Sequence, residues 1–180
     1  LFPAAKFLHL IRDGRAVFSS VRKLDWGPST CEAAAGWWAR HVAAGLAFEE
    51  THDDRCLQVR YELLMRSHDA EMERIREFLM IDSDAALVEG TFSLPRYTRS
   101  QHELVSFAPD VSRVDAWRAE LSGRQIEIFE FFSAGMLAHL GYDMTTGHSS
   151  KGPSALERAQ AAFAEWWHNE WGNLRQRKRF

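Results

Sequence analysis

Apolar and polar positions in the first part of the chain predict strands followed by helices. Residues 6–11 form a short, nearly continuous apolar run, which is typical of a strand covered on both faces in a parallel sheet. A break at 12–14 follows, and then apolar residues at helical spacing over 16–21. Residues 56–61 alternate and predict a second strand. The pattern predicts an α/β fold, with a partial parallel sheet flanked by helices.

Further along the chain, periodicity and capping signals predict mostly helices. In three pairs a serine precedes a glutamate or glutamine by three positions, as in a capping box: Ser29 with Glu32, Ser122 with Gln125, and Ser154 with Glu157. We expect the first helix to run to Thr51 and the second to stop at Gly141. A helix after Ser67 and a short one over 83–92 precede an irregular stretch, 93–112, of a length that is usually functional or mobile.

The end of the chain differs from the rest. A polar stretch over 144–152 is predicted to link one domain, 1–143, to an amphipathic helix over 153–180. The last six residues of the chain include four cations: Arg175, Arg177, Lys178 and Arg179. We expect this helix to pack on the domain or on a partner. Its basic end suits anionic lipid or nucleic acid, but four charges at a helix end indicate little, and no nucleic-acid partner is expected.

Composition narrows the classes of function. The 180 residues are 46% apolar and 26% charged, as in ordinary globular domains. The net charge of -3 gives no general attraction to nucleic acid or acidic lipid, so an anion site must be built locally from a few arginines. No apolar run reaches the roughly 18 residues that span a bilayer. No signal peptide is visible, and a cytoplasmic location is expected.

Thiol and metal chemistry have little support in the sequence. Cys31 and Cys56 do not have metal-ligand spacing, so we expect two free thiols that are buried or half-buried. The eight histidines are scattered, without a ligand pattern such as HExxH. No metal site is therefore predicted.

Arg12 and Ser20 have the chemistry of a phosphate site. Ligands of a parallel α/β sheet bind beyond the carboxyl ends of its strands, where Arg12 stands. The helix that follows offers free backbone N–H groups and a partial positive charge. Ser20 lies eight residues after Arg12 and could turn its hydroxyl to the same phosphate. From the residues alone, the alternative is an arginine that binds carbonyl groups at the sheet edge and a solvated serine.

The segment KFLHLIRDGRAVFSSV, residues 6–21, resembles the 3'-phosphate-binding strand, loop and helix of sulfotransferases. The family pattern is an apolar strand, an arginine, a short loop and a serine eight positions after the arginine. Arg12, Gly14 and Ser20 fall on this pattern and are the implied nucleotide-binding residues. The resemblance implies a P-loop-like sulfotransferase architecture. It also implies 3'-phosphoadenylyl sulfate (PAPS) as the sulfate donor and no metal.

A second segment, 57–79, is similar to the family's next landmark, a strand followed by Tyr-Glu-Asp-Leu and a helix ending in Phe-Leu. The resemblance implies that Tyr61 lies against the adenine of the nucleotide. It departs from the family at Leu63, where the aspartate is expected. A core tyrosine at the end of a strand is the alternative for Tyr61, and Glu62 is interpreted as a structural carboxylate.

A third segment, 112–122, is similar to the family's late loop, a basic residue followed by a glycine-containing turn and a tryptophan. The resemblance implies that Arg113 folds over the 3'-phosphate, and Trp117 is expected to be a packing anchor. Asp115 stands where the family has glycine. A carboxylate near a phosphate is unfavourable unless it turns away or pairs with an arginine.

The resemblance implies a transferase in which an acceptor hydroxyl or amine attacks sulfur in line and adenosine 3',5'-bisphosphate leaves. In the family, the 5'-phosphosulfate loop and the general base precede the Arg-Ser motif. The chain begins at Leu1 in a predicted core strand, so we expect these groups upstream and expect the 180 residues to be inactive alone. The acceptor, whether small molecule, glycan, lipid or protein, and the oligomeric state stay open.

Two other functions are open at this point. A P-loop kinase-like nucleotide-binding protein would share the architecture, and a GxxxxGK[ST] motif upstream would favour it. A degenerate, non-catalytic interaction domain is the other alternative. Leu63 and Asp115, the two departures from the family pattern, favour it.

Overall fold

The computed structural model describes residues 4–24, 26–81, 109–147 and 150–177, without the side chains of 171–177. The chain divides into two compact units, Leu1–Ile11 with Glu49–Ser112 and Arg12–Phe48 with Arg113–Phe180. The predicted short helix over 83–92 and most of the irregular stretch 93–112 lie outside the described residues.

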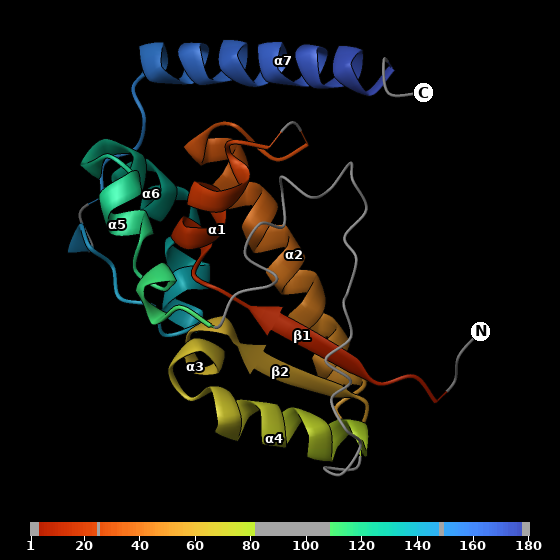
Figure 1. Ribbon diagram of the computed structural model, residues 1–180. Coiled ribbons are helices and arrows are strands. Elements are labelled where there is room, and N and C mark those ends of the chain that lie inside the picture. Colours follow the sequence, from red (N-terminus) through yellow and green to blue (C-terminus); the bar gives the residue numbers. More distant parts are fainter. Residues whose placement is uncertain (1–3, 25, 82–108, 148–149, 178–180) are drawn as a thin grey trace. The chain divides into compact units, whose positions relative to one another are not determined.

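In the first unit, two parallel strands form a small sheet with two helices beside β2 (Figure 1). These elements are β1 (Phe7–Ile11), β2 (Cys56–Arg60), α3 (Tyr61–Arg66) and α4 (His68–Leu79). The register places Ile11 opposite Arg60, so both strands end at the same edge. The chain continues from these two ends into Arg12 and Tyr61.

The apolar run of β1 is less covered than the sequence predicted. The side chains of Phe7, Leu8 and Leu10 are 44%, 44% and 54% exposed, whereas Ile11 is buried. Among the described residues β1 has a single strand neighbour, β2, and a two-stranded sheet leaves much apolar surface in contact with water. The prediction of a strand covered on both faces is therefore wrong for this part of the chain.

The second unit is helical. Its helices are α1 (Gly14–Val21), most of α2 (Cys31–Thr51), α5 (Trp117–Glu120), α6 (Gly123–His139) and α7 (Ala155–Arg177), and the short turn η2 (Val111–Arg113) lies at its border. The core is built on Phe129, whose ring centroid lies 6.2 Å from that of Phe18 and 6.0 Å from that of Trp38. Together, the small parallel sheet and these helices confirm the predicted mixed α/β class and its helix-rich later part.

Helix ends follow the local signals with one exception. Ser122 and Gln125 form the predicted capping box of α6, and Gly141 follows the helix with φ +73°. The start of α2 differs from the prediction. Thr30 Oγ1 accepts a hydrogen bond from Ala33 N at 3.4 Å, while Ser29 Oγ donates to a carboxylate of α7. Ser29 is therefore occupied by a distant partner and does not form the predicted box.

The predicted linker holds residues that are bound to the rest of the second unit. The backbone N–H groups of Thr145 and Thr146 donate to the two carboxylate oxygens of Glu130 at 2.9 and 3.0 Å. The predicted boundaries at 143 and 153 stay a prediction. In the part of the chain that the structure describes, no helix combines the length and the apolar composition needed to cross a membrane.

Candidate functional site

Arg12 contacts the loop that carries Arg113. Its Nη2 donates a hydrogen bond to the backbone carbonyl of Arg113 at 3.1 Å, although the two residues are 101 positions apart. The backbone carbonyl of Arg12 accepts a hydrogen bond from Trp38 Nε1, also at 3.1 Å, which fixes the main chain at this point. Arg12 is half-buried and Arg113 is exposed. The side chain of one predicted phosphate-binding cation, Arg12, is thus held at the backbone of the other, Arg113.

The N-terminus of α1 is capped from within the chain. The carboxylate of Asp13 accepts a hydrogen bond from the backbone N–H of Arg15 at 2.8 Å. A phosphate at this helix end would meet that carboxylate, so the expectation of free N–H groups is wrong for Arg15. An anion near α1 must therefore be bound mainly by side chains such as Arg12.

Ser20 and its neighbour Ser19 differ in their surroundings. Ser20, which the sequence assigned to the phosphate, is exposed on α1. Ser19 is buried and donates its hydroxyl to Glu120 Oε2 at 2.6 Å. Lys23 Nζ lies 3.6 Å from the same oxygen. The Ser19 hydrogen bond, together with the charges of Lys23 and Arg113, lowers the pKa of Glu120 against the opposing effect of partial burial.

Gly14 is required by close packing. A Cβ atom at this position would lie 2.5 Å from Trp38 Cδ2 and 2.7 Å from Phe129 Cζ, closer than real Cβ contacts. The absence of a side chain lets α1 begin directly against these two rings. A contact between Gly14 and a nucleotide stays a prediction.

Tyr61 is the first residue of α3 and is half-buried in the first unit. It directly follows Arg60, the last residue of β2. Its predicted place against adenine stays a prediction, as does the structural role of Glu62.

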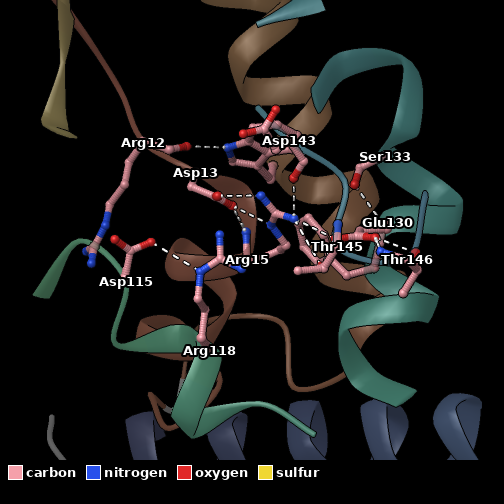
Figure 2. A network of polar contacts seen from close by, with 12 residues as sticks. Arg12, Asp13, Arg15, Asp115, Arg118, Glu130, Ser133, Asp143, Thr145 and Thr146 are labelled. Atoms are coloured by element: carbon pink, nitrogen blue, oxygen red, sulfur yellow. Dashed lines mark hydrogen bonds and ion pairs between the residues drawn. The ribbon is translucent and has the colours of Figure 1, made fainter. Parts of the chain in front are cut away.

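A buried ionic network lies next to Arg12 in sequence and was not predicted (Figure 2). Arg15 is 1% exposed and Glu130, on α6, is 0% exposed. Arg15 Nη2 pairs with Asp13 Oδ2 at 2.7 Å, and Arg15 Nη1 pairs with Glu130 Oε1 at 2.5 Å. Arg15 Nη1 also donates to the backbone carbonyl of Asp143 at 2.9 Å. Both charges of the α1–α6 contact are thus paired within the protein.

The second half of this network surrounds Glu130. Its Oε1 accepts hydrogen bonds from the backbone N–H and hydroxyl of Thr145, and its Oε2 accepts the same pair from Thr146. Burial alone would raise the pKa of Glu130, but the hydrogen bonds from the two threonines lower it to about 2. Glu130 is therefore a carboxylate at every pH near neutrality.

The loop from Arg113 to Trp117 agrees with two expectations from the sequence. Asp115 Oδ1 lies 3.3 Å from Arg118 Nε, so this carboxylate does pair with an arginine. Trp117 is 2% exposed, which confirms it as a packing anchor. The guanidinium carbons of Arg15 and Arg118 lie 4.2 and 4.4 Å from the centroid of its ring.

Comparison with known proteins supports the family resemblance. Residues 1–85 match the model of the Sulfotransferase family. The chain is 30% identical over 155 residues to Protein-tyrosine sulfotransferase A of Caenorhabditis elegans, a match that covers 79% of the chain and 40% of the relative. It is 30% identical over 159 residues to Protein-tyrosine sulfotransferase of Drosophila melanogaster, covering 79% of the chain and 31% of the relative. These matches support assignment to a sulfotransferase family.

The chain spans less than half the length of the two relatives it matches. The family model covers the segments that carry Arg12, Gly14, Ser20 and Tyr61, whereas Arg113 lies beyond it. The contact between Arg12 and Arg113 therefore joins the family-matched segment to a later loop.

Sequence reasoning missed the buried pair Arg15 and Glu130. Arginine and glutamate are mostly exposed in proteins, and Arg15 has no local signal of burial. The signal that was available is Glu130 between phenylalanines in FEFF, residues 129–132. A charge inside such a run indicates a buried partner.

Thiols and metal ligands add nothing to the site. Cys31 and Cys56 are free and half-buried, as predicted. Burial raises the pKa of Cys31 to about 11, so its thiol is a poor nucleophile near neutral pH. The described residues contain no group of three or more His, Cys, Asp or Glu side chains that could hold a metal ion.

Proposed function

We propose that this chain supplies the 3'-phosphate and adenosine side of a sulfotransferase site that uses PAPS as its donor, in a P-loop-like architecture. The observation that carries the proposal is the contact between Arg12 and the Arg113 loop. It holds the guanidinium of Arg12 at the backbone of Arg113, and the family resemblance assigns both residues to one phosphate. A planar guanidinium suits a phosphate monoester because it donates two parallel hydrogen bonds.

The order of the residues along the chain agrees with the contacts that the family resemblance implies. Ile11 and Arg60 pair at the carboxyl ends of β1 and β2, and Arg12 and Tyr61 are the next residues of the chain. Ligands of parallel α/β sheets bind at this edge. In the proposed role, Arg12 and Arg113 bind the 3'-phosphate and Tyr61 lies against the adenine.

The reaction we propose is the transfer of a sulfuryl group to an acceptor hydroxyl or amine, with adenosine 3',5'-bisphosphate as the leaving group. The acceptor oxygen or nitrogen forms a bond to sulfur as the bond to the nucleotide phosphate breaks, and the acceptor loses its proton. Such a transfer depends on position and on charge stabilisation. Cations that hold the 3'-phosphate fix the donor without touching the reacting sulfur.

The first acceptor to test is a tyrosine-containing peptide, because both relatives are named protein-tyrosine sulfotransferases. A tyrosine phenol has the hydroxyl that the proposed reaction needs. We expect the 180-residue chain to bind the nucleotide without transferring sulfate, since the family resemblance places the 5'-phosphosulfate loop before the Arg-Ser motif. Sulfate transfer from PAPS to such a peptide by this chain would contradict that expectation.

The binding test compares two nucleotides that differ only in the 3'-phosphate, adenosine 3',5'-bisphosphate and adenosine 5'-monophosphate. Isothermal titration calorimetry should show tighter binding of the bisphosphate by roughly ten- to a hundredfold, the value of one or two charge-assisted hydrogen bonds. Arg12→Ala should remove most of this preference and leave the affinity for the monophosphate almost unchanged.

The control is Arg158→Ala, an exposed arginine on α7 that is not assigned to the site. It should keep the full preference for the bisphosphate. Equal binding of both nucleotides by the unaltered chain would refute the 3'-phosphate site, and would favour the kinase-like or non-catalytic alternatives.

A further inference from the structure

α7 packs on its own unit through polar residues. Four residues at helical spacing are half-buried: Glu157, Ala161, Glu165 and His168. The carboxylate of Glu165 accepts hydrogen bonds from the backbone N–H and the hydroxyl of both Ser29 and Thr30, at 2.9 to 3.1 Å. Glu157 pairs with Arg124 of α6 at 2.8 Å. The polar side of α7 therefore faces protein.

The opposite side of α7 is aromatic and exposed. Phe163, Trp166 and Trp167 are 63%, 55% and 50% exposed. Their ring centroids lie 5.9 to 6.3 Å apart, so the three rings form one cluster. At 100° per residue, these positions stand roughly 140° to 240° around the helix axis from Ala161. We call these three residues, with Leu156 at 69% exposed, the aromatic face of α7.

This arrangement is the reverse of a helix on a globular core, where the apolar stripe is the one that packs on protein. Contiguous exposed aromatic residues mark a surface that binds something. We propose that the aromatic face of α7 binds an anionic lipid surface, with the helix lying in the plane of the interface. This inference does not depend on the proposed sulfate transfer.

The residue types and the charges of α7 favour an anionic lipid surface as the binding partner. Tryptophan and phenylalanine favour the boundary between head groups and acyl chains, and interfacial helices combine them with cations. Four cations stand among the last six residues of the chain, a composition that favours anionic head groups. Over positions 155–170, Glu170 is the one carboxylate whose helical position falls on the aromatic side. Charges at Glu157, Arg158 and Glu165 fit a helix that lies on a membrane rather than across it.

The test is co-sedimentation of the chain with vesicles of phosphatidylcholine alone and of phosphatidylcholine with one-fifth phosphatidylserine. We expect binding to the mixed vesicles, with a blue shift of tryptophan fluorescence. The double variant Trp166→Ala/Trp167→Ala should bind them at least about tenfold more weakly. Trp26→Ala is the matched control, since Trp26 is 54% exposed and lies outside α7; it should bind like the unaltered chain.

A charge variant tests the second half of the inference. Arg177→Gln/Lys178→Gln/Arg179→Gln should lose about tenfold or more on the mixed vesicles and change little on neutral ones. Binding of the double tryptophan variant within twofold of the unaltered chain would overturn the proposal, as would no binding of the unaltered chain to mixed vesicles. Sedimentation velocity gives a third outcome. A dimer that the tryptophan substitutions dissociate would assign the face to a second copy of the chain and overturn lipid binding.

Discussion

Replacement of Glu130 by glutamine should remove a large share of the stability that the buried network provides. Each carboxylate oxygen of Glu130 accepts hydrogen bonds from a backbone N–H and a hydroxyl, and Oε1 also pairs with Arg15. In glutamine, an NH2 group replaces one carboxylate oxygen. It would face a backbone N–H group that is itself a donor, so that hydrogen bond would be lost. It would also leave Arg15 with one carboxylate partner, Asp13, in a site where both side chains are buried.

The size of the effect follows from the pKa of Glu130. The folded protein lowers it from the ordinary 4.5 to about 2, a difference of about 2.5 pH units. At ~1.36 kcal/mol per unit, the charged form contributes ~3 kcal/mol to the free energy of unfolding. Loss of one partner of a buried ion pair costs about 3–5 kcal/mol, in the same range. We expect Glu130→Gln to lower the free energy of unfolding at pH 7 by about 3 kcal/mol.

The pH dependence of the free energy of unfolding gives a second test of the same pKa shift. Because the folded-state pKa is lower than the unfolded one, the contribution of Glu130 is fully present above about pH 4.5 and is lost as the pH falls toward 2. Between pH 7 and pH 3 the unaltered protein should lose about 2 kcal/mol of this contribution, and Glu130→Gln should not lose it, because glutamine does not titrate.

Urea unfolding followed by circular dichroism, at pH 7 and again at pH 3, measures both effects. Glu127→Gln is the control, because Glu127 stands on the same helix and forms a partly exposed pair with Arg124. That pair should be worth less than about 1 kcal/mol. Equal losses for Glu127→Gln and Glu130→Gln, or an unchanged pH dependence in the latter, would refute the idea that the network stabilises the fold.

Two further predictions concern the residues around Arg12. Gly14→Ala should lower the free energy of unfolding by about 1–3 kcal/mol, because the new Cβ atom would lie 2.5 Å from Trp38. Gly135→Ala is the control: no atom lies within 4 Å of its new Cβ atom, so it should raise the free energy of unfolding by up to about 1 kcal/mol. Equal effects of the two variants in urea unfolding would contradict the packing argument. Glu120→Gln should tighten the binding of adenosine 3',5'-bisphosphate, measured by calorimetry, by about three- to tenfold. The amide keeps an acceptor for the Ser19 hydroxyl and removes a negative charge. Weaker binding would show that the carboxylate is needed to hold the cations.

Local patterns predicted the elements well. The apolar runs gave β1 and β2 within a residue, and the Ser122 capping box with Gly141 marked both ends of α6. These features depend on neighbours a few positions away, so the sequence contains all that is needed. Burial of β1 was predicted wrongly, because coverage depends on which other segments pack on the strand.

Long-range partners could not be predicted in the same way. Arg15 and Glu130 are 115 positions apart, and Ser29 and Glu165 are 136 apart. The contact of exposed Ser20 with a phosphate stays a prediction, whereas the bond between its buried neighbour Ser19 and Glu120, 101 positions away, had no signal in the sequence. The resemblance named Arg12 and Arg113 for one ligand, but only the structure shows that they are in contact.

The charges around Arg12 fit the proposed anion site in a protein of net charge -3. Residues 12–23 and 113–120 together carry six cations and three carboxylates, so this part of the second unit is locally positive. Each of the three carboxylates has a cation partner: Asp13 with Arg15, Asp115 with Arg118, and Glu120 with Lys23. Arg15 also pairs with Glu130, so the buried network takes up the carboxylates of Asp13 and Glu130 together. At short range these pairs weaken the field of the carboxylates, which favours an anion site built from the arginines of the two segments.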